Sequence, residues 1–147
     1  MTHIGYLLAD NSRLARWSFD QQVREIGVTG PQARLLLTLN RRPGENQGFY
    51  AEQLEVEPIT LCRMVDRLED AGLVERRADL NDRRARRLHL TDKSREKLTR
   101  LRERLDAMVD EILAGLSLAE REEFARLLAA VRTNLAAQRE QEKAANG

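Results

Sequence analysis

The sequence is poor in the residue types on which disulfide-linked, metal-stabilised and aromatic-rich folds depend. Its 147 residues include one cysteine, Cys62, and two widely separated histidines, His3 and His89. A single cysteine cannot close an intrachain disulfide, and two isolated histidines do not complete a zinc site. Aromatic residues make up 4% of the chain and charged residues 33%, a composition that favours charged helices over a sandwich or barrel. We therefore expect a mainly helical protein without a metal or cofactor, in a reducing compartment such as the cytoplasm.

Long apolar runs and an excess of one charge are also missing. No segment approaches the roughly 18 apolar residues that a membrane span requires. Met1–Asp10 lacks the basic start and apolar stretch of an export signal. We expect no membrane segment and no export. The 25 basic and 24 acidic residues leave a net charge of +1, so only the local distribution of charge can indicate a polyanionic partner.

The residues that enzymes need for catalysis are not grouped in this sequence. There is no nucleophile beside a base, no cluster of metal ligands and no glycine-rich phosphate-binding motif. The many carboxylates instead follow the spacing of helix surfaces. We therefore predict that the chain is not an enzyme.

The spacing of apolar residues in the first third of the chain predicts three helices. Ile4–Ile26 has the pattern of a long amphipathic helix, and Thr29–Gln32 is a capping box that opens a second, well-buried helix. The segment Arg41–Gly48 carries proline and glycine and is predicted to be a loop. A short third helix is expected over Gly48–Val56.

The middle of the chain predicts a fourth helix followed by a hairpin. Proline suits the first position of a helix, so we expect a helix over Pro58–Ala71, closed by Gly72. Leu73–Arg77 and Arg86–Leu90 are predicted to be two short strands joined by a loop.

The last third of the chain predicts two more helices. Thr91 is the expected N-cap of a long helix whose leucines follow near-heptad spacing. Ser117–Glu120 is a second capping box and opens the last helix. A chain of this length fits one compact domain.

Two consecutive short helices followed by a hairpin describe a winged helix-turn-helix, whose second helix enters the major groove of DNA. Near the start of that helix, after Pro58, the outward face carries Ile59, Thr60 and Arg63. These side chains can contact a thymine methyl group, offer a hydroxyl and donate two hydrogen bonds to guanine. The alternative is an ordinary solvated helix surface, which leaves an exposed Ile59 unexplained.

The predicted wing concentrates positive charge. Arg76–Arg87 contains six arginines and two aspartates, a local charge of +4 within twelve residues. Arginine contributes to DNA affinity through phosphate contacts and enters narrow minor grooves. We expect Arg83 and Arg84 in the minor groove, with Asp82 bonded to one of their guanidinium groups. Phosphate contacts or simple solvation are expected for the remaining arginines, which are Arg76, Arg77, Arg86 and Arg87. The alternative for the whole segment is a solvated run of charge.

Three segments, Val65–Arg77, Asn81–Ala85 and Leu88–Thr91, resemble the MarR family of bacterial regulators. Leu116–Ser117 at the start of the last helix, together with the arginine-bearing first helix, is most similar to the SlyA-like branch of that family. The resemblance spans nearly the whole chain. By match, Arg63 takes the place of a DNA-contacting arginine, and Asp82, Arg83 and Arg84 occupy the wing-tip motif. One departure is Glu55, where the family commonly has glycine. A left-handed backbone at this position would be strained.

The resemblance implies a homodimer in which the first and last two helices interlock. Residues 29–91 would form the winged helix-turn-helix lobe of one protomer, 1–147, with dimerisation helices in residues 1–28 and 92–140. The apolar faces of the terminal helices also need a cover, although a self-contained coiled coil is an alternative. A two-fold dimer would bind a pseudo-palindromic site in double-stranded DNA.

The expected function is therefore sequence-specific transcriptional regulation, most simply repression that a small ligand relieves. The alternative is a winged-helix module that binds another protein and has no operator. The resemblance implies a small aromatic acid as effector, with Arg13 and Arg16 near its carboxylate. Ala33 and Leu37 stand where the SlyA-like branch has larger side chains, which predicts a more apolar pocket. Solvated arginines are the alternative.

Cys62 lies on the flank of the predicted recognition helix. Oxidation there could alter docking on DNA, but a lone cysteine is more often a small packing residue. Both interpretations stay open.

Overall fold

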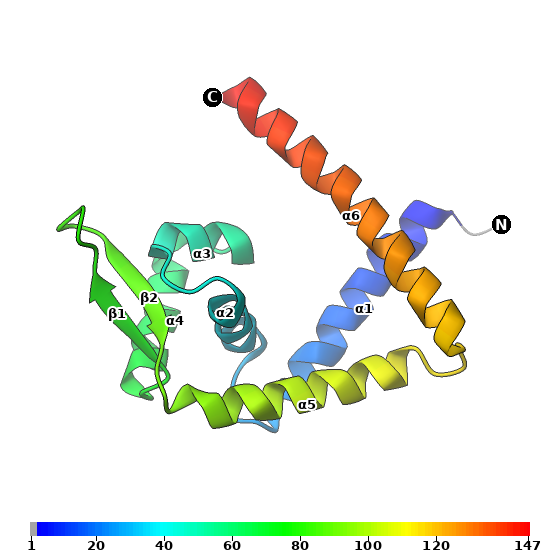
Figure 1. Ribbon diagram of the computed structural model, residues 1–147, viewed down its shortest axis with the longest axis horizontal. Helices are drawn as coiled ribbons and strands as arrows, with labels where there is room; N and C mark the ends of the chain where they lie inside the picture. Colours follow the sequence, from blue (N-terminus) through cyan, green and yellow to red (C-terminus); the bar gives the residue numbers. More distant parts are fainter. Residues whose placement is uncertain (1–2) are drawn as a thin grey trace. The chain divides into compact units, whose positions relative to one another are not determined.

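A computed structural model describes residues 3–147 as six α-helices and one antiparallel pair of strands (Figure 1). The predicted mainly helical fold with a small hairpin wing is confirmed. In chain order the elements are α1 (Ile4–Arg24), α2 (Gly30–Arg41), α3 (Gln47–Leu54), α4 (Pro58–Asp70), β1 (Val74–Ala78), β2 (Arg86–Leu90), α5 (Ser94–Ile112) and α6 (Leu118–Asn146). One compact unit ends at Met108, and Val109–Gly147 forms a second. None of the helices in residues 3–147 combines the length and apolar character that a transmembrane helix requires.

Both predicted capping boxes are present. The hydroxyl of Thr29 accepts a hydrogen bond from the amide of Gln32 at 3.2 Å, and the Gln32 side chain accepts one from the Thr29 amide at 3.0 Å. Ser117 and Glu120 form the same reciprocal pair before α6. Helix starts of this kind are predictable because both partners lie within four consecutive residues.

The prediction that Thr91 caps the following helix is wrong. The helix α5 begins at Ser94, three residues later than Thr91. The Thr91 hydroxyl donates a hydrogen bond to the carbonyl of Gly72 at 2.5 Å, and the Ser94 hydroxyl donates to the Thr91 carbonyl at 2.6 Å. Thr91 therefore ties the end of the wing to the turn after α4.

The core of the first unit gathers apolar side chains from both ends of the winged region. The helix α2 contributes fully buried leucines, and α4 buries Leu61, Met64, Val65 and Leu68. The strand β2 and the helix α5 add further buried leucines. The largest of these fully buried apolar side chains are Leu35, Leu36, Leu39, Leu61, Val65, Leu88 and Leu101.

The wing is held on one side by the loop before α3. The strands β1 and β2 pair from Val74↔Leu90 to Ala78↔Arg86. The amide of Leu88 also donates to the carbonyl of Glu45 at 3.0 Å, and the amide of Gly44 donates to the carbonyl of Leu88 at 2.9 Å. The 44–46 segment therefore pairs with β2 along the edge that β1 leaves free.

The side chain of Tyr50 holds the shape of that loop by hydrogen bonds to its backbone. Its buried hydroxyl donates to the carbonyl of Arg42 at 2.5 Å and accepts from the amide of Glu45 at 3.1 Å. Burial raises the pKa of the Tyr50 phenol, whereas the hydrogen bond from Glu45 lowers it to a smaller extent. The position of the wing beside α3 therefore depends on one neutral phenol.

We expect Tyr50→Phe to lower the free energy of unfolding by about 1–3 kcal/mol, because it leaves a backbone carbonyl and a backbone amide without their buried partner. Urea unfolding at one protein concentration measures the change. Tyr6→Phe is the matched control, since Tyr6 is 65% exposed. Equal stability of the two variants would contradict the assigned role of Tyr50.

Candidate nucleic-acid interface

The first turns of α4 present the predicted base-reading residues to solvent. Pro58 occupies the first helical position, and Thr60 and Arg63 are exposed. Ile59 is 59% exposed, although it is a large aliphatic side chain. The opposite side of α4 is buried in the core. The structure therefore brings Pro58, Ile59, Thr60 and Arg63 together on the free side of the helix.

The turn that leads into α4 has a left-handed residue. Glu55 has φ 55° and ψ 45° and is the only residue other than glycine with a positive φ within residues 3–147. The following amide, of Val56, donates to the carbonyl of Ala51 at 3.0 Å and closes α3. A left-handed backbone favours glycine, the residue that the MarR resemblance leads us to expect here. This chain forms the same turn with Glu55, at a cost in backbone strain.

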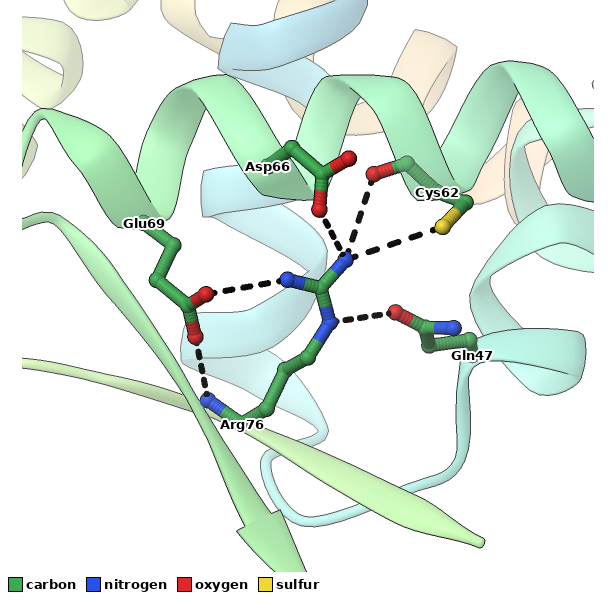
Figure 2. Close-up of polar contacts among 5 residues, drawn as sticks. All are labelled: Gln47, Cys62, Asp66, Glu69 and Arg76. Carbon is green, nitrogen blue, oxygen red and sulfur yellow. Dashed lines mark hydrogen bonds and ion pairs between the residues drawn. The ribbon is translucent and has the colours of Figure 1, made fainter. Parts of the chain in front are cut away.

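Arg76 of β1 forms ion pairs and hydrogen bonds with residues of α3 and α4 (Figure 2). Its side chain is 17% exposed and forms ion pairs with Asp66 at 2.7 Å and Glu69 at 3.0 Å. Its Nε donates to the Gln47 side chain at 2.9 Å, and Nη2 donates to the carbonyl of Cys62 at 3.2 Å. We call these five residues the Arg76 clamp.

The clamp joins three elements. Gln47 begins α3, whereas Cys62, Asp66 and Glu69 lie on α4. Burial lowers the pKa of the Arg76 guanidinium, but the hydrogen bond and charge of Asp66, followed by those of Glu69, raise it above the usual value. The prediction that Arg76 holds phosphate or stays solvated is therefore wrong, because two carboxylates of α4 already neutralise it.

The other wing arginines divide into two groups. Arg77 forms an ion pair with Glu75 at 2.5 Å, and Arg87 forms one with Asp79 at 3.2 Å. Arg83, Arg84 and Arg86 are exposed, and their guanidinium groups form no ion pair or hydrogen bond with any residue in 3–147. The free positive charge of the wing is therefore concentrated around its tip.

Two aspartates shape the backbone of the wing tip. A side-chain oxygen of Asp82 accepts from the backbone amide of Arg84 at 3.0 Å, and one of Asp79 accepts from the amide of Asn81 at 2.9 Å. The hydrogen bond from Asn81 is the largest cause of the lowered pKa of Asp79, and Arg87 adds to it. The predicted bond between Asp82 and a guanidinium group is not formed, because the carboxylate is used by the turn.

Leu80 lies at the wing tip and was not among the residues predicted to contact DNA. It follows Asp79 and is 101% exposed, the largest exposure among the exposed apolar side chains. The sequence signal was available, since Leu80 is the single aliphatic residue with a large side chain among the polar residues of the loop.

A pocket of about 840 Å³ lies in the first unit, between residues of α1, α2, α3 and α5. Of the expected effector residues, Arg16 and Leu37 line it. Arg13 is outside the lining and pairs with Asp10 at 2.7 Å, and Ala33 is fully buried in the core. Three further arginines that were not predicted as effector residues also line this pocket, and they are Arg34, Arg41 and Arg102. Arg34 and Arg41 lie seven residues apart on α2, whereas Arg102 lies on α5 and joins them only when the helices pack.

We expect Arg76→Ala to lower the free energy of unfolding by about 1–3 kcal/mol, because the polar groups of α4 and α3 lose a shared, mostly buried partner. Arg77→Ala is the matched control on the neighbouring residue. Its pair with Glu75 is half exposed, so the expected loss is below about 0.5 kcal/mol. Thermal and urea unfolding measure both variants, and equal losses would show that the clamp adds no particular stability.

Comparison with known proteins gives concordant matches. A family model described as "MarR family" matches residues 28–85. The solved structure of a transcriptional repressor, CouR, bound to a 23-mer DNA duplex is 30% identical, with a TM-score of 0.75, and the match covers 88% of this chain and 92% of that chain. The transcriptional regulator PA3341 is 31% identical, with a TM-score of 0.77 and coverage of 92% and 99%.

A crystal structure of MarR itself supports the fold. It is 24% identical to this chain, with a TM-score of 0.84 and coverage of 95% of each chain. The resemblance seen in the wing and recognition-helix motifs is thereby confirmed at the level of the family, whereas the SlyA-like branch stays a prediction. The chain belongs to the MarR family and is a transcriptional regulator.

Proposed function

We propose that the chain is a homodimeric repressor that binds a specific operator and is released by a small anionic ligand. The observation that carries the proposal is the division of the wing arginines. Three are held by carboxylates of the chain, whereas Arg83, Arg84 and Arg86 have free guanidinium groups. Free arginines on a narrow hairpin are suited to a polyanion with grooves.

The recognition helix supplies base reading in this proposal. Arg63 donates two hydrogen bonds to a guanine, Thr60 offers its hydroxyl, and Ile59 contacts a thymine methyl group. Pro58 places the first turn of α4 against the DNA. This role explains the exposure of Ile59, because its apolar surface is covered only in the complex with DNA.

The wing supplies minor-groove and phosphate contacts. Arg83 and Arg84 enter the minor groove, and Arg86 binds phosphate. Asp82 contributes through the turn, since its bond to the Arg84 amide holds the tip in shape. The repressor CouR in complex with a DNA duplex supports both DNA binding and repression for this chain.

The dimer rests on apolar side chains that the chain itself leaves uncovered. No residue of α6 is buried, yet its exposed apolar residues recur at the spacing of one helix face. The helix α1 also exposes several large apolar side chains. These residues are Ile4, Leu7, Leu8, Leu14 and Trp17 in α1, and Phe124, Leu127, Leu128, Val131 and Leu135 in α6.

We propose residues 1–28 and 92–140 as the dimerisation segments and residues 29–91 as the DNA-binding lobe. A two-fold dimer would present its recognition helices about 34–36 Å apart, one turn of DNA, on a pseudo-palindromic operator. The ligand is proposed to bind in the pocket that Arg16 and Leu37 line. Redox sensing by Cys62, whose Sγ is 3.7 Å from Arg76 Nη2, stays a hypothesis.

The DNA-binding proposal is tested by selecting bound fragments from the host genome and measuring affinity for the recovered site against random DNA. Replacing Arg83 and Arg84 with alanine is expected to lower operator affinity at least about 100-fold. The slope of log affinity against log salt should fall by about 2, because each arginine charge removed from the complex leaves about one counterion unreleased from the DNA. Arg95→Ala is the control, since Arg95 lies outside α4 and the wing and pairs with Asp92.

Two outcomes would contradict different parts of the proposal. No preference of the wild-type protein over random DNA would exclude operator binding and favour the protein-binding alternative. Unchanged affinity of the double variant for the operator would leave DNA binding in place but remove the role of the wing arginines.

We expect Leu128→Glu to shift the protein from dimer to monomer, because a carboxylate would be placed in the apolar surface between two copies. Sedimentation velocity measures the change in mass. Thr133→Glu is the matched control, since it adds the same charge on the other side of α6. A dimer that survives both substitutions would exclude this face of α6 from the interface.

A further inference from the structure

We infer that the pocket of the first unit is suited to an amphipathic ligand with two or more anionic charges on an apolar body. This inference rests on the ligand-binding part of the proposed function and makes its ligand more specific. A small acid with a single carboxylate would satisfy the charge of the pocket only in part.

The pocket collects unpaired positive charge from separate helices. Arg16 of α1, Arg41 of α2 and Arg102 of α5 all line it. None of the three forms an ion pair or side-chain hydrogen bond with a residue in 3–147. A fourth arginine, Arg34, is paired with Asp20 at 3.1 Å and lies 5.9 Å from the Phe19 ring centroid. No carboxylate from the described part of the chain lines the pocket.

Several arginines elsewhere in the chain are instead neutralised by carboxylates. The chain has 24 acidic residues, and exposed arginines as far apart as Arg13, Arg95 and Arg126 pair with a carboxylate three residues away. Carboxylates were therefore available in quantity, but none forms an ion pair with the three arginines of the pocket. Because these arginines line one pocket without a counter-charge, an anion that enters it would be attracted by all three.

The number of arginines sets the number of anionic groups. One carboxylate forms a bidentate pair with one guanidinium group, and the remaining arginines then keep their charge uncompensated. A phosphate monoester or two separate carboxylates can engage two or three guanidinium groups. The chemistry shared by these ligands is a charge of at least two on oxygen acceptors.

The rest of the lining favours an apolar body on the same ligand. Five apolar side chains face the pocket together with a few uncharged polar ones. The apolar residues are Ala15, Phe19, Leu37, Leu54 and Leu105. The volume of about 840 Å³ lies toward the upper end of the roughly 300–1,000 Å³ of small-molecule sites. The space therefore exceeds the needs of an acid with a single ring.

The inference is tested by calorimetric titration of the full-length protein with compounds that share one ring system and differ in charge. The probes are 2-naphthol, naphthalene-2-carboxylate, naphthalene-2,6-dicarboxylate and 2-naphthyl phosphate. At pH 7.5 the phosphate monoester is mainly doubly charged, because its second pKa is about 6. We expect at least one doubly charged probe to bind about tenfold or more tightly than the monocarboxylate. Which of the two binds better separates a phosphorylated ligand from a polycarboxylate.

Variants then assign the binding to the three arginines. Arg16→Ala, Arg41→Ala and Arg102→Ala should each lower affinity for the better doubly charged probe about 5- to 20-fold. Arg41→Lys should restore part of the loss, which a general disturbance of folding would not produce. Arg100→Ala is the matched control on α5, since Arg100 lies two residues from Arg102 and outside this pocket.

Equal affinity for singly and doubly charged probes would overturn the inference, as would alanine variants that bind like the wild-type protein. These titrations contain no DNA, so their failure is distinguishable from a failure of operator binding. Tight binding of a doubly charged probe that leaves operator affinity unchanged would support the inference and remove ligand release from the proposed function.

Discussion

The arrangement of the DNA-facing surface depends on one largely buried guanidinium group, that of Arg76. Arg76 leaves β1 and reaches Asp66 and Glu69 on α4 and Gln47 at the start of α3. A helix, a hairpin and the start of a second helix are thereby joined by charge-assisted hydrogen bonds with fixed directions. Because the guanidinium group is planar and offers several donors, one side chain can set the orientation of all three elements. The recognition helix and the wing are thereby tied together by direct side-chain contacts.

The pairing of carboxylates with other wing arginines explains how a nearly neutral protein keeps free positive charge at the wing tip. The net charge is +1, and the acidic residues near α4 and the base of the wing are used internally by Arg76, Arg77 and Arg87. The remaining arginines at the tip keep their charge because the nearby Asp79 and Asp82 accept hydrogen bonds from the backbone of the turn. The positive charge at the wing tip therefore results from which groups the nearby carboxylates bind.

A comparable distribution of charge defines the pocket. Its arginines come from α1, α2 and α5, and only one of them, Arg34, is paired with a carboxylate, that of Asp20. The wing tip and the pocket are therefore two places in the first unit where arginine side chains gather without counter-charges. A groove of DNA suits the first, and a compact anion with an apolar body suits the second.

Features that depend on neighbours in the chain were predictable from the sequence. The capping boxes at Thr29 and Ser117 involve partners three residues away, and the exposure of Ile59 follows from its place on an amphipathic helix. The family resemblance also rests on local motifs. It therefore anticipated the winged fold and the regulatory function, and the left-handed Glu55 is consistent with the glycine that the family prefers there.

Features that depend on segments far apart in the chain were decided by the tertiary structure alone. Arg76 and Arg83 are chemically identical members of one basic run, yet only Arg76 reaches the carboxylates of α4. Thr91 resembles an N-cap, but its hydroxyl is bound by the carbonyl of Gly72 across the wing. The pocket arginines have no common motif because they meet only when the helices pack. Periodicity and capping chemistry determined the elements of this protein and their exposed faces, whereas long-range hydrogen bonds and ion pairs decided which charges stay free to bind a partner.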